Sequence, residues 1–140
     1  MYKIIEANAK RKNPRVKNGF GVLWLGCIID HLGFDWEKYR CRGEILDYNL
    51  DGNVLTIYQD TAWCEQEGFR ECIEKKYPSI KVYYRDEEPG CGVYYTNDST
   101  GKYFPDLISE LRTDRRSGNT DSTADNALDH TNQSHFSIPP

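Results

Sequence analysis

The sequence has no long hydrophobic run, no closely paired cysteines and a single methionine. No apolar stretch approaches the ~20 residues that a membrane-spanning helix needs. The first residues, Met-Tyr-Lys-Ile-Ile-Glu, also lack the apolar stretch of a signal peptide. These absences exclude a membrane protein and predict a cytoplasmic protein with no membrane contact. The length of 140 residues favours one domain, and a mean hydropathy of −0.77 indicates that part of the chain does not pack.

Five cysteines are present, but their spacing is wrong for a metal site. The gaps between them are 14, 23, 8 and 19 residues, so the chain has neither a Cys-x-x-Cys pair nor the clustered cysteines of an iron–sulfur site. An odd number of cysteines without a signal peptide is typical of reduced thiols in a cytosol. The sequence therefore predicts no bound metal and no cofactor. The five residues are Cys27, Cys41, Cys64, Cys72 and Cys91.

The charge is unevenly distributed along the chain. Residues 1–19 carry six basic residues against one acidic residue, a net charge of +5, and most of it lies between Lys10 and Lys17. Residues 20–105 carry nine basic and fifteen acidic residues, a net charge of −6. Binding to phosphates needs a basic face, and only the N-terminal arm offers one. This balance favours a protein partner over a nucleic acid.

Hydrophobic periodicity predicts the elements of the first half. Tyr2 to Glu6 is predicted to be a strand, and the polar, basic stretch from Asn8 to Asn18 a loop. Apolar residues repeat at three and four positions from Phe20 to Gly33, which predicts a helix with Gly33 as its C-terminal cap. Residues 35–39 add a further turn.

The second half begins with a hairpin signal. Asp51-Gly52 separates two alternating runs, Gly43 to Leu50 and Asn53 to Asp60, and predicts a two-residue turn that pairs Tyr48 with Leu55 and Leu46 with Ile57. A second helix is predicted from Cys64 to Tyr77, where Pro78 ends it. Strands are then expected at Ile80 to Arg85 and at Cys91 to Thr96.

This order of elements predicts an α+β fold. It is the ferredoxin-like β-α-β-β-α-β sandwich with an additional C-terminal strand, where "ferredoxin-like" names an architecture and implies no cluster. The predicted domain is residues 1–105, of which 1–19 include the first strand and the basic loop. Residues 106–140 are polar, with Phe136 as their one aromatic residue, and are predicted to be a disordered tail that folding does not require.

Several short stretches between residues 20 and 105 resemble the YubB-type ferredoxin-like domain family. That family occurs on plasmids, prophages and other mobile elements and has no established biochemical function. The resemblance therefore implies a fold and a mobile-element origin, and it implies no catalytic residue. The stretches are Trp24-Leu25-Gly26-Cys27, Thr61-Ala62-Trp63, Lys76-Tyr77-Pro78, the run from Tyr84 to Gly90, and Thr96-Asn97-Asp98.

The predicted topology brings four residues to one end of the sheet: Arg42, Trp63, Glu87 and Glu88. A tryptophan beside charged groups has the composition of an interface hot spot. We therefore expect a small protein-binding module that uses this surface. The simpler alternative is that Trp63 caps the core and the charged residues pair with each other.

Two other functions remain open from the sequence. The basic arm, with a sheet face carrying Tyr58, Lys81, Tyr83 and Arg85, indicates a nucleic-acid-binding module as the first alternative. The second alternative is a carboxylate- or thiol-dependent enzyme at the Trp63 and Glu88 end, but no catalytic set is assembled.

Three groups have the right chemistry for that enzyme, and each has a simpler structural interpretation. They are the helical pair Cys27 and His31, the thiol of Cys64 at a helix start, and the run Asp86-Glu87-Glu88, which more often forms a solvated turn.

Overall fold

A computed structural model describes residues 1–17, 20–62, 66–88, 93–105 and 132–138. Within these ranges the fold is α+β, and no helix is long and apolar enough to cross a membrane. The helices are α1 (Tyr2–Ala9), α2 (Leu25–Leu32), the short 3-10 helix η1 (Trp36–Lys38) and α3 (Glu67–Lys76). The strands are β1 (Gly43–Asp51), β2 (Val54–Thr61), β3 (Tyr83–Glu88), β4 (Val93–Thr96) and β5 (Asn132–Ile138).

The N-terminal strand prediction is wrong, because the segment Tyr2 to Glu6 lies within helix α1. Ile5 and Asn8 are both fully buried and lie three residues apart, so one helical side of this segment faces the core. The carboxylate of Glu6 pairs with the ammonium of Lys10 at 2.9 Å, one helical turn later.

Helix α2 is shorter than predicted, since it begins at Leu25 rather than at Phe20. Its end agrees with the prediction: Gly33 is the C-terminal cap in a left-handed conformation, with φ of 94°. The expected further turn is also present as η1, where the Asp35 carboxylate accepts from the backbone N–H of Glu37.

The predicted hairpin is confirmed, but its register is shifted by two residues. Gly52 and Asn53 form the turn, and Asp51 pairs with Val54. A bulge between Ile45 and Asp47 then moves the register by one, so that Ile45 becomes buried and Leu46 is 54% exposed. The predicted pairing, which puts Leu46 on the buried face and Ile45 on the opposite one, is therefore wrong.

The later elements are present with altered bounds. Helix α3 ends before Pro78, as predicted, and begins at Glu67. Cys64, the predicted start, lies outside the described residues. Strand β3 begins at Tyr83 and extends to Glu88, later than the predicted Ile80 to Arg85. The expected additional strand is confirmed over Val93–Thr96, while Cys91 lies outside the described residues.

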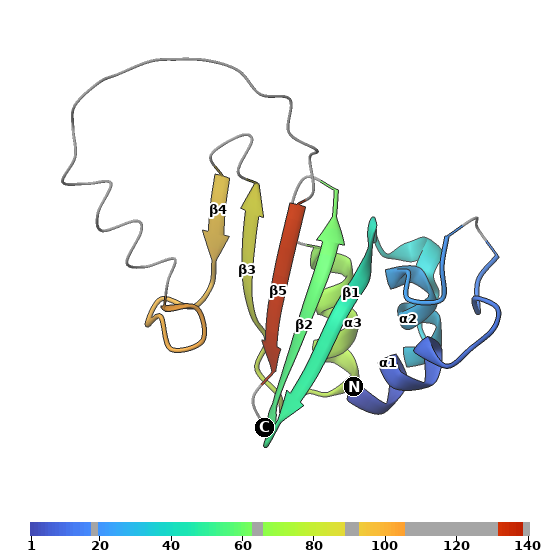
Figure 1. Cartoon of the computed structure of the whole chain (residues 1–140), viewed down its shortest axis with the longest axis horizontal. Coiled ribbons are helices and arrows are strands. Elements are labelled where there is room, and N and C mark those ends of the chain that lie inside the picture. The colour runs from blue at the N-terminus through green and yellow to red at the C-terminus, as the bar shows by residue number, and fades with distance from the viewer. Residues whose placement is uncertain (18–19, 63–65, 89–92, 106–131, 139–140) are drawn as a thin grey trace, which may run out of the picture.

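Strand β5 corrects the predicted topology. The sheet order is β1-β2-β5-β3-β4, and β5 pairs antiparallel with both β2 and β3 (Figure 1). β2 and β3 are therefore parallel, and together with α3 they form a βαβ unit that β5 splits. The splitting strand comes from residues 132–138 and not from residues 2–6, so the element order is not β-α-β-β-α-β. The prediction of a disordered tail is wrong for residues 132–138, and residues 106–131 lie outside the described ranges.

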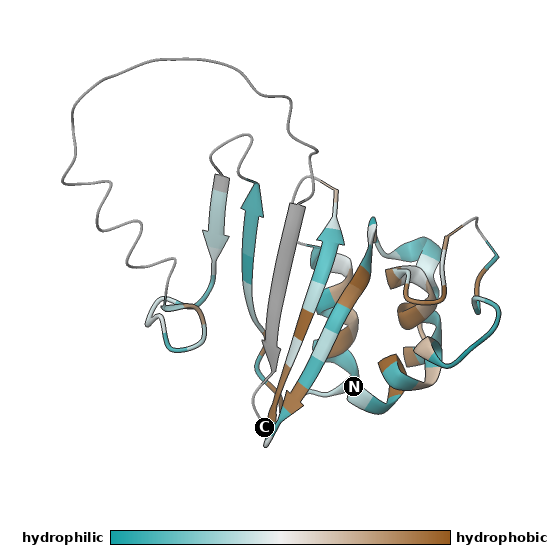
Figure 2. Cartoon of the chain, viewed as in Figure 1, coloured by the Kyte–Doolittle hydropathy of each residue, from teal (hydrophilic) through white to brown (hydrophobic). Residues whose placement is uncertain are grey.

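The hydrophobic core lies between the helices and one face of the sheet. Figure 2 shows the hydrophobic residues concentrated in α2 and in parts of α1, β1 and β2. The largest fully buried core residues come from the three α-helices and from β2: Ile5, Leu25, Ile28, Ile29, Leu32, Ile57, Phe69 and Ile73. At one end of the sheet β1 begins with Gly43 and β2 ends with Thr61, and these two residues pair with each other. This end adjoins the start of α3 and forms the candidate site.

Candidate functional site

The structure places three of the four predicted site residues at the same end of the sheet. Arg42 precedes β1, and its carbonyl accepts from the N–H of Ala62, which follows β2, at 3.1 Å. Glu87 and Glu88 end β3, which runs parallel to β2, so they lie at that end as well. Trp63 lies outside the described residues. Arg42 precedes β1 and Glu88 ends β3, and these strands are three positions apart in the sheet, about 14 Å. The two residues therefore share an end without forming one cluster.

The acidic run Asp86-Glu87-Glu88 forms the end of a strand rather than a solvated turn. Its side chains alternate between the two faces of the sheet, as in any strand. Asp86 is 2% exposed on the core side, while the Glu87 carboxylate pairs with the Arg85 guanidinium at 2.7 Å. The three carboxylates of this run therefore do not point toward one common site. Across the described part of the chain, no group of three potential metal ligands occurs.

Arg42 belongs to a segment that is held firmly against the start of α3. The backbone N–H of Arg42 donates to Oε1 of Gln66 at 2.6 Å, and Gln66 is buried. At Gly68, a Cβ atom would lie 2.6 Å from the carbonyl oxygen of Arg40, so only glycine permits this approach. These two contacts fix where Arg40 and Arg42 project.

A groove of about 880 Å³ lies between this segment and α3. Most of its charged side chains are already paired: Lys75 contacts Glu71 at 2.9 Å and also lies over the Tyr39 ring, 5.1 Å from its centre. The guanidinium groups of Arg40 and Arg42 form no ion pair with any residue in the described ranges. They are therefore the groove's available positive charges. The lining residues are Lys38, Tyr39, Arg40, Arg42, Ala62, Gln66, Glu67, Gly68, Glu71 and Lys75.

A second groove, of about 660 Å³, meets the first at Arg42 and Ala62. It is aromatic on one side, where Phe20 is 61% exposed and stacks on Trp24 with ring centres 5.4 Å apart. The Trp24 ring lies flat against Gly26, where a Cβ atom would overlap it. Glu44 and Asp60 also line this groove.

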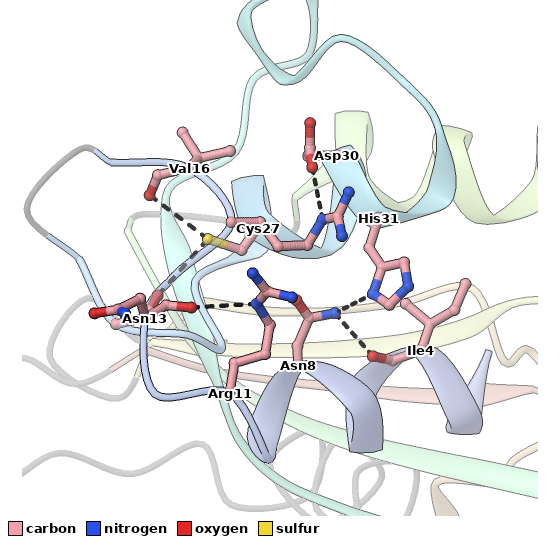
Figure 3. Close-up of polar contacts among 10 residues, drawn as sticks. Ile4, Asn8, Arg11, Asn13, Val16, Cys27, Asp30 and His31 are labelled. Carbon is pink, nitrogen blue, oxygen red and sulfur yellow. Dashed lines mark hydrogen bonds and ion pairs between the residues drawn. The ribbon is translucent and has the colours of Figure 1, made fainter.

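Cys27 and His31 lie on the same helix, but the structure does not pair them. Figure 3 shows the Nδ2 amide of Asn8 donating both to the Ile4 carbonyl, at 2.8 Å, and to Nδ1 of His31, at 2.7 Å. The Cys27 thiol instead approaches the Val16 carbonyl at 3.9 Å. The chemistry of a thiol activated by imidazole is therefore absent from this pair.

The environment of His31 favours its neutral form. Burial lowers the pKa of His31, and the nearby positive charges of Arg15 and Arg11 lower it further. The Asn8 amide has its orientation set by the Ile4 carbonyl, so Nδ1 of His31 is the acceptor and the ring carries its proton on Nε2.

Two of the described thiols are held in their protonated form. Burial raises the pKa of Cys41 and of Cys72 to about 11 each. A thiolate is the reactive species, so neither residue has the character of a nucleophile. Cys64, the candidate at the helix start, lies outside the described residues.

The sheet face proposed for base stacking is partly covered. The ring of Tyr83 packs against that of Tyr103, with ring centres 4.6 Å apart and an angle of 31° between the planes, and the Arg85 guanidinium lies 5.7 Å from the centre of the Phe104 ring. Both covering residues belong to the loop after β4. Of the four residues expected to form the open face, Tyr58 and Lys81 are exposed while Tyr83 and Arg85 are half-buried.

The basic arm is also partly neutralised. Lys10 pairs with Glu6 at 2.9 Å and Arg15 with Asp30 at 2.7 Å, and Arg11 donates to the Asn13 carbonyl. Lys12 and Lys17 are exposed. The arm therefore offers a small number of positive charges to a phosphate backbone.

Sequence reasoning missed four residues of this site: Phe20, Arg40, Gln66 and Gly68. The sequence held one local signal for Arg40. Arg40 and Arg42 are two residues apart just before a predicted strand, and side chains at that spacing project to the same side of an extended segment. The other contributions depend on α3 packing against residues 39–42, which no local pattern indicates.

Comparison of the chain with protein families, with curated proteins and with solved structures finds no match.

Proposed function

We propose that this chain is a small cytoplasmic protein-binding module whose binding surface is the end of the sheet around Arg42. One observation carries the proposal: Arg42 lies where the two grooves meet, and its guanidinium has no ion-pair partner in the described ranges. Arginine and aromatic residues are the side chains that dominate binding energy at protein interfaces.

The aromatic side of the second groove supports the same function. Phe20 keeps 61% of its surface exposed although its neighbour Trp24 is buried in the core. An exposed aromatic ring beside an available arginine offers a partner both apolar area and a charge-assisted hydrogen bond. Three free buried cysteines, Cys27, Cys41 and Cys72, are consistent with the proposed reducing compartment.

A nucleic-acid-binding function has less support. Acidic residues line both grooves, namely Glu67 and Glu71 in the first and Glu44 and Asp60 in the second. A continuous phosphate backbone that crossed Arg42 would meet these negative charges. No observation favours the carboxylate- or thiol-dependent enzyme.

The relationship to the YubB-type ferredoxin-like domain, and the mobile-element origin it implies, is likewise a proposal. The split βαβ unit of β2, α3 and β3 supports it, since such a unit is half of the ferredoxin-like arrangement. Three of the stretches that carry the resemblance begin within this unit, at Thr61, Lys76 and Tyr84, whereas the stretch from Trp24 to Cys27 lies at the start of α2.

The test is affinity capture from a lysate of the source organism with three forms of the chain: wild type, Arg42→Glu and the control Lys12→Glu. The control makes the same charge change at an exposed lysine of the N-terminal arm. We expect a protein retained by the wild type and by Lys12→Glu to be lost with Arg42→Glu, and retention to survive nuclease treatment. Identical retention by all three forms, or capture that nuclease abolishes, would contradict the proposed function.

A further inference from the structure

We infer that the occupant of the first groove is an extended peptide segment that carries two carboxylates two residues apart, followed by an apolar side chain. The inference rests on the proposed protein-binding function and names the chemistry of the partner. It depends on how Arg40 and Arg42 are spaced, on the negative charges around them and on the neighbouring aromatic surface.

The two arginines lie on a backbone segment that is held in place. Tyr39 has extended backbone angles, with φ of −114° and ψ of 128°, and the chain continues from there toward β1. In an extended segment, residues two apart project to the same side about 6.7 Å from each other. Arg40 and Arg42 both line the groove, while Cys41 between them is buried in the core. The pair therefore presents two arginine side chains on one side, with their backbone positions separated by about the two-residue repeat of an extended chain.

Contacts with α3 hold the backbone of this pair in place before any ligand arrives. The Arg42 N–H is bound to Gln66, and Gly68 packs directly on the backbone of Arg40. A segment that is already ordered loses less conformational entropy on binding, which favours affinity. Guanidinium groups bind carboxylates with two parallel hydrogen bonds, so they suit acidic side chains.

The surrounding charges limit the length of the negative segment. Glu67 and Glu71 border the arginine pair in the first groove, and Glu44 and Asp60 border it in the second. Two ligand carboxylates can pair with the two arginines. A third or fourth would approach Glu44 and Asp60, whereas Glu67 and Glu71 are partly compensated by Arg70 and Lys75. A short acidic pair in a peptide is favoured over a long polyanion such as RNA.

The second groove indicates what lies beside the acidic pair. It continues from Arg42 and Ala62 to the stacked rings of Phe20 and Trp24. Burial of the exposed part of Phe20 by an aliphatic or aromatic side chain of the peptide would contribute favourable free energy. The ligand therefore combines two acids with one neighbouring apolar residue.

The experiment is selection from a displayed library of random twelve-residue peptides on the immobilised full chain. We expect enriched peptides to share an acidic residue, any residue, a second acidic residue and a nearby apolar residue. Affinities of a synthetic selected peptide are then measured by fluorescence anisotropy. Arg40→Glu and Arg42→Glu should each weaken binding by about tenfold or more, and Lys12→Glu by less than about twofold.

A charge swap separates the inference from loss of folding. A peptide whose two acids are replaced by lysine should bind the Arg40→Glu, Arg42→Glu double variant better than it binds the wild type. Arg42-dependent peptides without an acidic pair would overturn this inference and leave the protein-binding proposal standing. Peptides that bind regardless of Arg42, or displacement of the peptide by a single-stranded RNA 20-mer, would overturn both. Failure to enrich any peptide would overturn the inference.

Discussion

Substitution of Gly68 by alanine tests whether α3 holds the arginine segment in place. The added Cβ would lie 2.6 Å from the Arg40 carbonyl oxygen, 3.0 Å from the Arg40 nitrogen and 3.2 Å from Cβ of Tyr39. All of these are backbone or backbone-proximal atoms, so no flexible side chain can move aside. The segment itself is held by the bond from Arg42 N–H to Gln66. The substitution must therefore displace either α3 or residues 39–42.

Two opposing free energies set the expected size of the effect. Alanine is favoured over glycine by about 1 kcal/mol in a helix interior, which is the upper bound for Gly68 because it is the second residue of α3. Overpacking of a well-packed contact costs about 1–3 kcal/mol, and the upper part of that range applies because the obstructing atoms are backbone. We expect the free energy of unfolding of Gly68→Ala to fall by about 1–2 kcal/mol, the difference between these two effects.

The assay is urea denaturation followed by circular dichroism, with Gly33→Ala as the comparison variant. Gly33 has φ of 94°, and no atom lies within 4 Å of the point that an added methyl group would occupy. Alanine there costs about 1 kcal/mol of backbone strain without touching the groove. Both variants should show a lower urea midpoint, but Gly68→Ala alone should shift the amide resonances of residues 39–42. A Gly68→Ala protein as stable as the wild type would refute the reasoning, since helix propensity would then outweigh the contact.

Stability should also respond to pH, to truncation and to the state of the thiols. Because folding lowers the pKa of His31, the stability that neutral His31 contributes is fully present above the unfolded pKa and is lost as the pH falls below that value. Asn8→Asp places a carboxylate beside the ring, so it should weaken or reverse this pH dependence in urea denaturation measured across pH. A chain that ends at Pro105 lacks the central strand β5 and should fail to give a cooperative thermal transition by circular dichroism, and a normal melting curve would contradict the topology. In a variant that keeps only Cys41 and Cys72, a thiol reagent at pH 8 should react only after denaturant is added, and rapid labelling of the native protein would show that the thiols are accessible.

Local patterns are sufficient to predict the hairpin, the second helix and the C-terminal cap at Gly33. Each of these depends on neighbouring residues: a turn dipeptide, an apolar repeat and a glycine after it. The register of the hairpin does not follow from them, because Gly52-Asn53 suits a two-residue turn as well as Asp51-Gly52 does. The bulge at Leu46 then reverses which of two adjacent apolar residues is buried.

The two large errors concern segments whose local signals are weak or misleading. Tyr-Lys-Ile-Ile-Glu contains β-branched residues that favour a strand, although Ile5 and Asn8 have helical spacing. The strand β5 is built from Asn-Gln-Ser-His-Phe-Ser-Ile, a polar segment, and pairing with both β2 and β3 places it in the sheet. Such pairing between distant residues is set by tertiary structure, which overrides propensity.

The candidate site is predictable from the sequence in its location but not in its composition. Parallel β2 and β3 bring Arg42, Glu87 and Glu88 to one end, and the order of elements is sufficient to predict that. The grooves themselves arise where α3 packs on residues 39–42, and this contact makes Arg40, rather than Glu87, the companion of Arg42.

The role of the Arg42 end as the binding surface is tested most directly by mapping amide chemical shifts in the full chain as the captured partner, or the selected peptide, is added. We expect the largest changes on residues that line the two grooves, in particular Arg40, Arg42, Ala62, Gln66 and Gly68. Changes concentrated instead on Tyr58 and Tyr94 of the exposed sheet surface, with the groove residues unaffected, would contradict the assignment of the Arg42 end as the binding surface.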